Sequence, residues 1–412
     1  MNASMTPRER IRAALRFQET DRTPRDLAGM RSTGISAFAY PDLVRALGLP
    51  PRLPRVYDVG QMLALPEVDV LDALDCDVVP VEGDVCTNAF DEPDRWHEYD
   101  FGGRLPALVR NPDQFTIHDD GTVTASSSGR PDGERDLKMP TGSNVFDALH
   151  GGQPIDLASD LHMEDLGLLR ERQADAIPSR ERIEAVGAYC ERARTATPRA
   201  IMFAGLSAHL GYPGGFPHWS MICLTEPDYV HAYHEIVTDT AVRQIEALLP
   251  RIANSIDLLM LNADDQGLQD RTILPPALFR ELYVPYYRKV TSAVHRIAPE
   301  VKCFLHSCGA VYDLIDDIAD CGFDVLNPVQ WPAGGRTAAE WRARADGRLV
   351  LWGGGVNTQS TMPLGSIPQI RDEVRRTVAA LGDGGGYVFC AIHNLLAEIS
   401  GEKVVAMYGA VQ

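Results

Sequence analysis

A histidine and a cysteine separated by one residue stand out in the segment FLHSC, where His306 and Cys308 follow an apolar run. Residues two apart on an extended chain point to the same side, so both side chains would face one site. Imidazole and thiolate are ligands that proteins use for zinc, and catalytic zinc sites leave one position open for substrate. The pair by itself is a weak signal, because a structural cysteine beside a hydrogen-bonded histidine gives the same pattern.

A metal at this pair needs a third ligand from another part of the chain. The segment GGGYVFCAIHN offers Cys390 and His393, again at the end of an apolar run. Strand ends that are distant in sequence can converge across the mouth of a closed barrel. The spacing does not choose between these two residues.

The elements that would position these residues alternate between short apolar strands and helices. Apolar runs of strand length separated by helical patterns are typical of a parallel sheet. Eight such units argue for an α/β fold, the TIM (β/α)8 barrel, with its active site at the carboxyl ends of the strands. The predicted strands are 22–29, 76–82, 199–206, 256–264, 301–306, 323–329, 348–354 and 386–392.

Residues 85–150 break this alternation. They are rich in Gly, Pro, Asp and Ser and contain short alternating pieces such as GTVTASS, which are typical of hairpins and loops. We therefore expect residues 1–412 to form one barrel in which this insertion follows the second strand and covers one mouth. A small separate subdomain is the alternative.

Composition limits the partners. The 412 residues include 57 acidic and 39 basic side chains, a formal charge of -18, which disfavours nucleic acid and anionic lipid surfaces. The first residues lack an apolar signal core, and no run approaches the length of a membrane span. The eight cysteines form no dense framework, as expected in a reducing compartment. We expect a cytoplasmic protein with no nucleic-acid or membrane partner.

Polar side chains at other predicted strand ends would share the same rim. Asp264 and Asp265 follow one strand directly and are candidates for a catalytic general base or hydrogen-bond acceptor, with a loop cap as the alternative. Side chains at the ends of two further strands could contact a polar substrate. These substrate-binding candidates are His209, Tyr212, Asn327 and Gln330.

Five segments together resemble the uroporphyrinogen decarboxylase superfamily, in its branch of cobalamin-dependent methyltransferases and demethylases. The resemblance covers nearly the whole chain and implies a TIM barrel. This chain resembles the zinc-dependent members of that branch, which carry a His-x-Cys…Cys pattern. The first two positions of the pattern fall on His306 and Cys308. The third falls on His393 by position, whereas Cys390 has the expected ligand type three residues earlier, so both stay candidates. The segments are MTPRERIRAALRFQETDRTP, DDQGLQDRTILPPALFRELYVPYYRKV, FLHSCGAVYDLIDDIADCGFDVLNPVQ, LWGGGVNTQSTMPLGSIPQIRDEV and GGGYVFCAIHNLLAEISGEKVVAMY.

The resemblance implies a zinc-dependent methyltransferase that moves a methyl group between a small methylated compound (ether, amine or thiol) and a corrinoid. Zinc would hold a thiol as thiolate or polarise the oxygen of a methyl ether, and the residues do not decide which. The chain shows no corrinoid-binding unit, so a separate protein or free cobalamin would supply the corrinoid. Barrels of this family are often dimers, which makes a homodimer a further expectation.

Two other functions stay open on the same barrel: a metal-free decarboxylase or lyase, and a non-catalytic relative. Decarboxylases of the family carry a motif similar to MRQAGR, whose arginines neutralise substrate carboxylates. The corresponding stretch here is MRSTGI, in which Arg31 remains and Ile35 stands in place of the second arginine. A polycarboxylate held by one arginine would be poorly compensated in a buried pocket.

Overall fold

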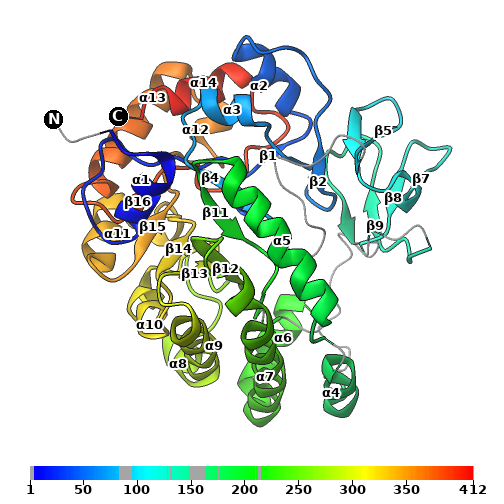
Figure 1. Ribbon diagram of the computed structural model, residues 1–412, viewed down its shortest axis with the longest axis vertical. Helices are drawn as coiled ribbons and strands as arrows, with labels where there is room; N and C mark the ends of the chain where they lie inside the picture. The colour runs from blue at the N-terminus through cyan, green and yellow to red at the C-terminus, as the bar shows by residue number, and fades with distance from the viewer. Residues whose placement is uncertain are drawn as a thin grey trace.

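A parallel sheet of seven strands forms the centre of the protein (Figure 1). The computed structural model describes residues 4–82, 95–127, 129, 132–148, 161, 163–174, 176–208, 210, 211 and 215–411. The strand order is β16-β15-β14-β13-β12-β11-β4, and every neighbouring pair is parallel. The strands are β4 (Val78–Val81), β11 (Ala200–Phe203), β12 (Leu258–Ala263), β13 (Lys302–His306), β14 (Val325–Asn327), β15 (Val350–Trp352) and β16 (Tyr387–Val388).

The segment around Arg25 joins the two edges of this sheet. Arg25 forms a parallel bridge with Phe389, directly after β16. On the other side, the N–H of Asp77, directly before β4, donates to the carbonyl of Arg25 at 2.8 Å. The predicted TIM barrel is thereby confirmed. The first predicted strand is shortened to this bridge because Pro24 has no N–H to donate and Ala28 has a φ of 61°.

Helices return the chain from each strand to the next on the outside of the barrel (Figure 1). The chain opens with α1 (Pro7–Ala14), whose Thr6 and Glu9 form a capping box. The other helices are α2 (Tyr40–Ala46), α3 (Val68–Ala73), α4 (Leu166–Ala174), α5 (Arg180–Ala196), α6 (Gly215–Thr225), α7 (Pro227–Ile252), α8 (Pro276–Leu282), α9 (Val284–Ile297), α10 (Ile315–Asp320), α11 (Ala338–Ala345), α12 (Thr361–Leu364), α13 (Ile367–Leu381) and α14 (Gly401–Tyr408). In the part of the chain that the structure describes, the short 3-10 turns are η1 (Arg31–Thr33), η3 (Pro112–Gln114), η4 (Tyr312–Leu314) and η5 (Ala333–Gly335).

The barrel interior is an apolar cluster distinct from the core between sheet and helices. Apolar side chains of α1 pack into it beside alternate residues of the strands, so α1 closes the end of the barrel at which the strands begin. Phe304 of β13 lies in this cluster, and strand alternation therefore places His306, two residues on, at the opposite end of the interior. The site is thus at the carboxyl ends of the strands.

The predicted insertion consists of antiparallel hairpins beside the barrel (Figure 1). Aromatic side chains hold it together, with ring centroids of Phe101 and Phe115 5.1 Å apart. Residues 83–94, 128, 130, 131, 149 and 150 lie outside the described residues, and the expectation that the insertion covers one mouth stays a prediction. Its strands are β5 (His97–Asp100), β6 (Pro106–Val109), β7 (Phe115–Ile117), β8 (Val123–Ala125), β9 (Leu137–Met139) and β10 (Asp147–Ala148). A further small sheet, not predicted, contains β1 (Ile35–Ser36), β2 (Val56–Asp58) and β3 (Leu63–Ala64).

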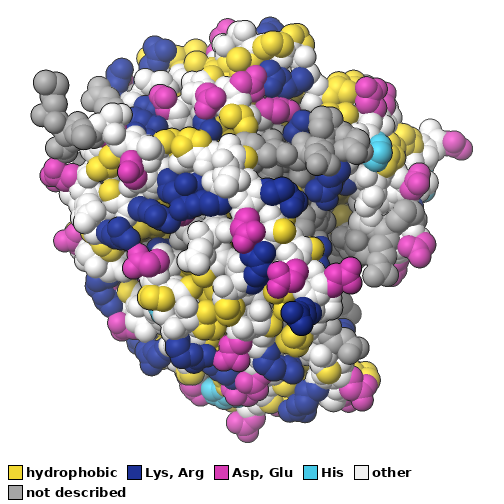
Figure 2. Space-filling view, in the orientation of Figure 1, with side chains coloured by type: hydrophobic (Ala, Val, Ile, Leu, Met, Phe, Trp, Pro, Cys, Tyr) yellow, Lys and Arg dark blue, Asp and Glu magenta, His cyan; other side chains and the backbone are white. Residues whose placement is uncertain are grey.

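The outer surface is strongly charged. Figure 2 shows basic and acidic side chains interspersed over the face in view. Ion pairs tie α1 to the start of the barrel strands, for example Arg12 to Asp257 at 2.8 Å. Within the described residues, no helix has both the length and the apolar sequence that crossing a bilayer requires.

Candidate metal centre

His306 and Cys308 present their side chains together at the end of β13. The Sγ of Cys308 lies 3.2 Å from Nε2 of His306, whose side chain is 6% exposed. The chain then turns at Gly309, whose φ of 88° favours glycine. A Cβ at this position would clash with the backbone of Gly267. Glycine therefore lets the chain leave the strand sharply while both potential ligands keep facing the barrel mouth.

His393 joins this pair from the segment after β16, three strands away from β13 in the sheet order. It follows β16, and its ring lies at a T-shaped angle to that of His306 with centroids 5.7 Å apart. One ligand atom from each of His306, Cys308 and His393 lies within 4.8 Å of the other two. Three potential ligands from two separate strand ends thus converge on one point.

Cys390 lies elsewhere. It belongs to the apolar interior of the barrel together with Phe304 and Trp352 and is 1% exposed. Burial raises the pKa of its thiol well above the usual range. Among the described residues, Cys390 is in neither of the two groups of side chains close enough to share a metal ion. The structure brings His393 rather than Cys390 to the His306–Cys308 pair.

Asn327 fixes the orientation of His306. Its Oδ1 lies 2.7 Å from Nδ1 of the imidazole, while its Nδ2 donates to the carbonyl of Trp352 at 3.0 Å. Because Asn327 uses its amide nitrogen on a carbonyl, its oxygen faces the ring as an acceptor, so Nδ1 of His306 carries the proton. Nε2, on the side of Cys308, is then left with the lone pair that a metal requires.

Asp265 lies beside the pair, whereas Asp264 is buried beneath it. Oδ1 of Asp265 accepts the N–H of Cys308 at 2.8 Å and lies 3.8 Å from Nε2 of His306. The carboxylate of Asp264 accepts from the hydroxyl of Tyr287 at 3.0 Å and the amide of Asn262 at 2.8 Å. Asp264 therefore holds the strand end in place, and Asp265 is the carboxylate that borders the metal group.

The surroundings favour neutral imidazole and neutral thiol in the absence of a cation. Burial, followed by the carboxylate of Asp265, raises the pKa of the Cys308 thiol far above its usual range. Burial and the neighbouring His306 lower the pKa of His393 to about 4. A divalent cation would displace the thiol proton and find the imidazole already deprotonated. Two imidazoles and a thiolate are a donor set that fits zinc with a position left for a substrate.

A pocket of about 660 Å³ opens above Cys308 and His393. Its lining combines apolar side chains with amides, and Gln330 also accepts the N–H of Gly309 at 2.8 Å. His209 and Tyr212 lie outside the described residues, so their predicted contacts with substrate are not part of this geometry. The pocket adds residues that the sequence did not single out. These are chiefly Gln269, Gln359, Asn394 and Glu398.

A second histidine–cysteine group lies at the opposite end of the same strand. His295, Cys303 and Asp324 also have ligand atoms within 4.8 Å of one another. Nε2 of His295 lies 2.8 Å from the Asp324 carboxylate, which also accepts the N–H of Cys303 at 2.8 Å. Lys302 completes the cluster at 3.0 Å from Asp324.

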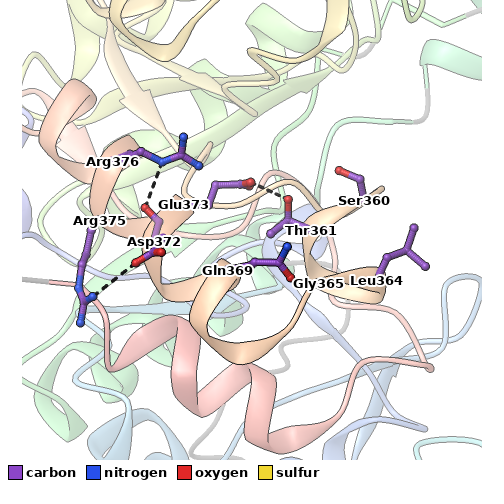
Figure 3. Close-up of a pocket in the computed structure, with 9 residues that line it drawn as sticks. All are labelled: Ser360, Thr361, Leu364, Gly365, Gln369, Asp372, Glu373, Arg375 and Arg376. Atoms are coloured by element: carbon purple, nitrogen blue, oxygen red, sulfur yellow. Dashed lines mark hydrogen bonds and ion pairs between the residues drawn. The ribbon is translucent and has the colours of Figure 1, made fainter.

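A second surface pocket, of about 770 Å³, lies between α12 and α13 (Figure 3). Its charged side chains contact one another or the backbone: Arg375 lies 3.7 Å from Asp372, and the side chain of Glu373 bonds Thr361. It shares no lining residue with the pocket above the metal group. No potential metal ligand described above lines it.

The family model of uroporphyrinogen decarboxylase matches residues 201–412, which is just over half of the chain and includes His306, Cys308 and His393. The chain belongs to the uroporphyrinogen decarboxylase family. The family resemblance expected from the five sequence segments is thereby confirmed.

Curated uroporphyrinogen decarboxylases are distant relatives. The enzyme of Xanthomonas campestris is 27% identical over 218 residues, which cover 50% of this chain and 57% of that protein. The enzyme of Pseudomonas fluorescens is 31% identical over 140 residues, or 34% of this chain and 37% of that protein. The matches to these family members therefore span little more than half of their length at most.

One solved structure matches nearly the whole fold. A methyltransferase from Methanosarcina mazei aligns with 99% of this chain and 98% of its own, at a TM-score of 0.52 and 16% identity. At that identity the similarity establishes a common fold. The barrel fold is thus shared with a protein that is a methyltransferase by name.

Proposed function

We propose that this family member is a zinc-dependent methyltransferase that moves a methyl group between a small methylated compound and a corrinoid. The observation that carries the proposal is the convergence of His306, Cys308 and His393 within 4.8 Å at the floor of a pocket. The methyltransferase of similar fold supports the reaction class. A separate protein or free cobalamin would supply the corrinoid.

Each side chain of the site has a part in this reaction. Zinc held there would supply a Lewis acid with one position open to the substrate. His306 and His393 would bind it as neutral imidazoles, the first oriented by Asn327 at 2.7 Å. Cys308 would bind it as thiolate.

Asp265 is the group in position to handle protons and polar substrate atoms. Its carboxylate already accepts the N–H of Cys308 at 2.8 Å, and its side chain is 37% exposed. A carboxylate there can accept the proton that Cys308 loses or orient a substrate hydroxyl. We therefore assign the base or acceptor role to Asp265, and a supporting role to the fully buried Asp264.

Decarboxylation of a polycarboxylate fits the site less well. The guanidinium of Arg31 lies 2.9 Å from Glu82 and 3.6 Å from Asp58. These two carboxylates already neutralise the arginine that would have to bind the acid groups of a substrate. A porphyrinogen carrying several carboxylates would therefore enter without enough compensating charge.

Zinc analysis of matched cysteine variants tests the proposal. The purified protein should contain one zinc per chain by elemental analysis, and Cys308→Ala should lose it. Cys303→Ala is the matched control, because Cys303 lies in the second histidine–cysteine group and should leave the zinc content unchanged. In a second measurement, a methylated donor should consume the absorbance of cob(I)alamin with the wild-type protein and the control but not with Cys308→Ala. Wild-type protein without zinc, or Cys308→Ala with full activity, would contradict the proposal.

A further inference from the structure

We infer that Asp26 is a positioning residue for the imidazole of His306 and that it acts through Trp352. The amide of Asn327 links the carbonyl of Trp352 to the imidazole. The consequence for zinc binding rests on the proposed function. The consequence for the imidazole itself can be measured in metal-free protein.

Three hydrogen bonds connect Asp26 with His306. Nε1 of Trp352 donates to Oδ2 of Asp26 at 2.8 Å. The carbonyl of Trp352 accepts Nδ2 of Asn327 at 3.0 Å. Oδ1 of Asn327 lies 2.7 Å from the protonated Nδ1 of His306. The chain of bonds thus runs from the segment around Arg25, through the ends of β15 and β14, to the end of β13.

The whole chain of bonds is shielded from solvent. The side chains of Asp26, Trp352 and Asn327 have no exposed surface, and His306 is buried as well. Hydrogen bonds are stronger in such surroundings than in water, and an unpaired polar group is costly there. Water therefore does not compensate for a bond that is lost at one end, and the change is passed on to the next group.

Asp26 is a firm anchor for the indole. Its N–H donates to the carbonyl of Phe389 at 2.8 Å, and its carbonyl accepts the hydroxyl of Tyr408 at 2.6 Å. Its second carboxylate oxygen accepts the N–H of Gly29 at 2.7 Å. Burial raises the pKa of Asp26 to about 6, so the group is a carboxylate at pH 7.5. Hydrogen bonds to an ionised group are roughly twice as strong as those between neutral groups.

The backbone after Trp352 makes the position of the indole important. Gly353 and Gly354 follow with φ values of 95° and 80°, where glycine moves freely. A Cβ at Gly353 would lie 3.3 Å from Nδ2 of Asn327, so glycine leaves room for the amide to reach the carbonyl. The N–H of Gly353 bonds the carbonyl of Val388 at 2.9 Å and holds one side of this peptide group. The indole, fixed by Asp26, holds the other side.

Nitrogen NMR of the imidazoles in metal-free protein at pH 7.5 tests the inference. In the wild type, His306 should be protonated at Nδ1, and His306→Gln identifies its signal. Trp352→Phe keeps an aromatic ring but removes the indole donor. It should speed solvent exchange of the Nδ1 proton at least about threefold, a factor that one ordinary hydrogen bond can supply. Asp26→Asn should have a similar effect, because its amide has one acceptor oxygen in place of two.

Two further variants separate positioning from general destabilisation. Val78→Ala removes apolar volume from the same barrel interior, and the side chain it shortens has no polar atom. It should lower the free energy of unfolding in urea and leave the exchange of the Nδ1 proton unchanged. A protein with both Asp26→Asn and Trp352→Phe should exchange no faster than Trp352→Phe alone, because Asp26 acts through the indole. Additive effects, or the same acceleration in Val78→Ala, would overturn the inference.

Chelator competition extends the test to the metal. Asp26→Asn and Trp352→Phe should each weaken zinc binding by about three- to tenfold, less than the loss of a direct partner of a ligand causes. The visible spectrum of the cobalt(II)-substituted protein should change in both, since it reports the geometry of the ligands. Faster exchange of the Nδ1 proton with unchanged zinc affinity would overturn the role in metal binding.

The outcomes distinguish this inference from the proposed function. Unchanged protonation and exchange of His306 in folded Asp26→Asn and Trp352→Phe overturn the inference, even if the protein holds zinc. A wild-type protein without zinc overturns the proposed function, even if both variants release the imidazole. If neither variant folds, the wild type decides: the indole proton of Trp352 and the Nδ1 proton of His306 should be equally protected from exchange, and unequal protection overturns the inference.

Discussion

The two ends of β13 each gather a histidine and a cysteine, but with different surroundings. At the carboxyl end, His306 and Cys308 meet His393 beneath a pocket. At the amino end, Cys303 meets His295 and Asp324. In both groups, ligand atoms of the three side chains lie within 4.8 Å of one another.

The amino-end group differs because several protein groups already bond to its carboxylate. Asp324 accepts from His295, from the N–H of Cys303 and from Lys302, so the amino-end group is an ion-pair network complete without a metal. These partners hold the pKa of Asp324 below its usual range despite burial. At the carboxyl end, Cys308 instead lies beside two imidazoles, and Cys308 and His393 line a pocket. Residue types alone therefore do not distinguish a metal centre from a structural ion pair.

The largest effect is expected when His393, the third potential ligand of the carboxyl-end group, is replaced. His393→Ala should weaken zinc binding by well over tenfold, because only two protein ligands remain. Cys390→Ala should keep the zinc and lose about 1 kcal/mol of unfolding free energy through a small cavity in the barrel interior. Chelator competition and urea unfolding measure the two quantities. If Cys390→Ala lost zinc and His393→Ala kept it, Cys390 rather than His393 would be the third zinc ligand.

Removal of the partner of His306 should have the next largest effect. Asn327→Ala leaves Nδ1 of the imidazole without its acceptor, and loss of such an orienting partner typically weakens metal binding about 10- to 100-fold. Chelator competition measures the affinity, and circular dichroism confirms that the variant is folded. Unchanged zinc affinity in a folded Asn327→Ala protein would show that the hydrogen bond to His306 is not needed.

In metal-free protein, lowering the pH should change the stability contributed by the two groups in different pH ranges. The folded pKa of His393 is lowered to about 4 from an ordinary 6.5. Its neutral form is therefore favoured by folding, and the associated stability is present above about pH 6.5 and lost as the pH falls toward 4. The pKa of Asp324 is lowered from its ordinary value of 3.8. Its contribution to folding stability should therefore be lost only below about pH 3.8.

Urea unfolding at pH 7.5 and 5.0 with a chelator present measures this difference. Relative to His393→Gln, which does not titrate, the wild-type protein should lose stability at the lower pH. Asp324→Asn should show nearly the same difference from wild type at both values. Parallel pH profiles of wild type and His393→Gln would contradict the assignment of a neutral buried imidazole.

The smallest effect should come from the amino-end group. Asp324→Asn should lower the free energy of unfolding by about 1 kcal/mol, since its ion pairs are partly exposed and screened. Zinc content should not change. Zinc loss in this variant, measured beside Cys303→Ala, would mean that the metal lies at the amino end.

Much of the barrel follows from local sequence. Seven of the eight predicted strands contain observed strands of the sheet, since short apolar runs between helical patterns are a local signal. The eighth, around Arg25, forms only a bridge, because Pro24 has no N–H to donate and the extended segment ends at Ala28, whose φ is 61°. The small sheet of β1, β2 and β3 was missed because strands of two or three residues carry no periodicity.

The sequence by itself determined the family, the barrel and the pairing of His306 with Cys308, because each depends on residues close together along the chain or on a pattern repeated through it. It could not choose between Cys390 and His393, nor separate Asp264 from Asp265. Tertiary structure decided these positions: the direction of each side chain at a strand end is set by the pleat and by the turn that follows. Those two features place Cys390 inside the barrel and His393 beside Cys308.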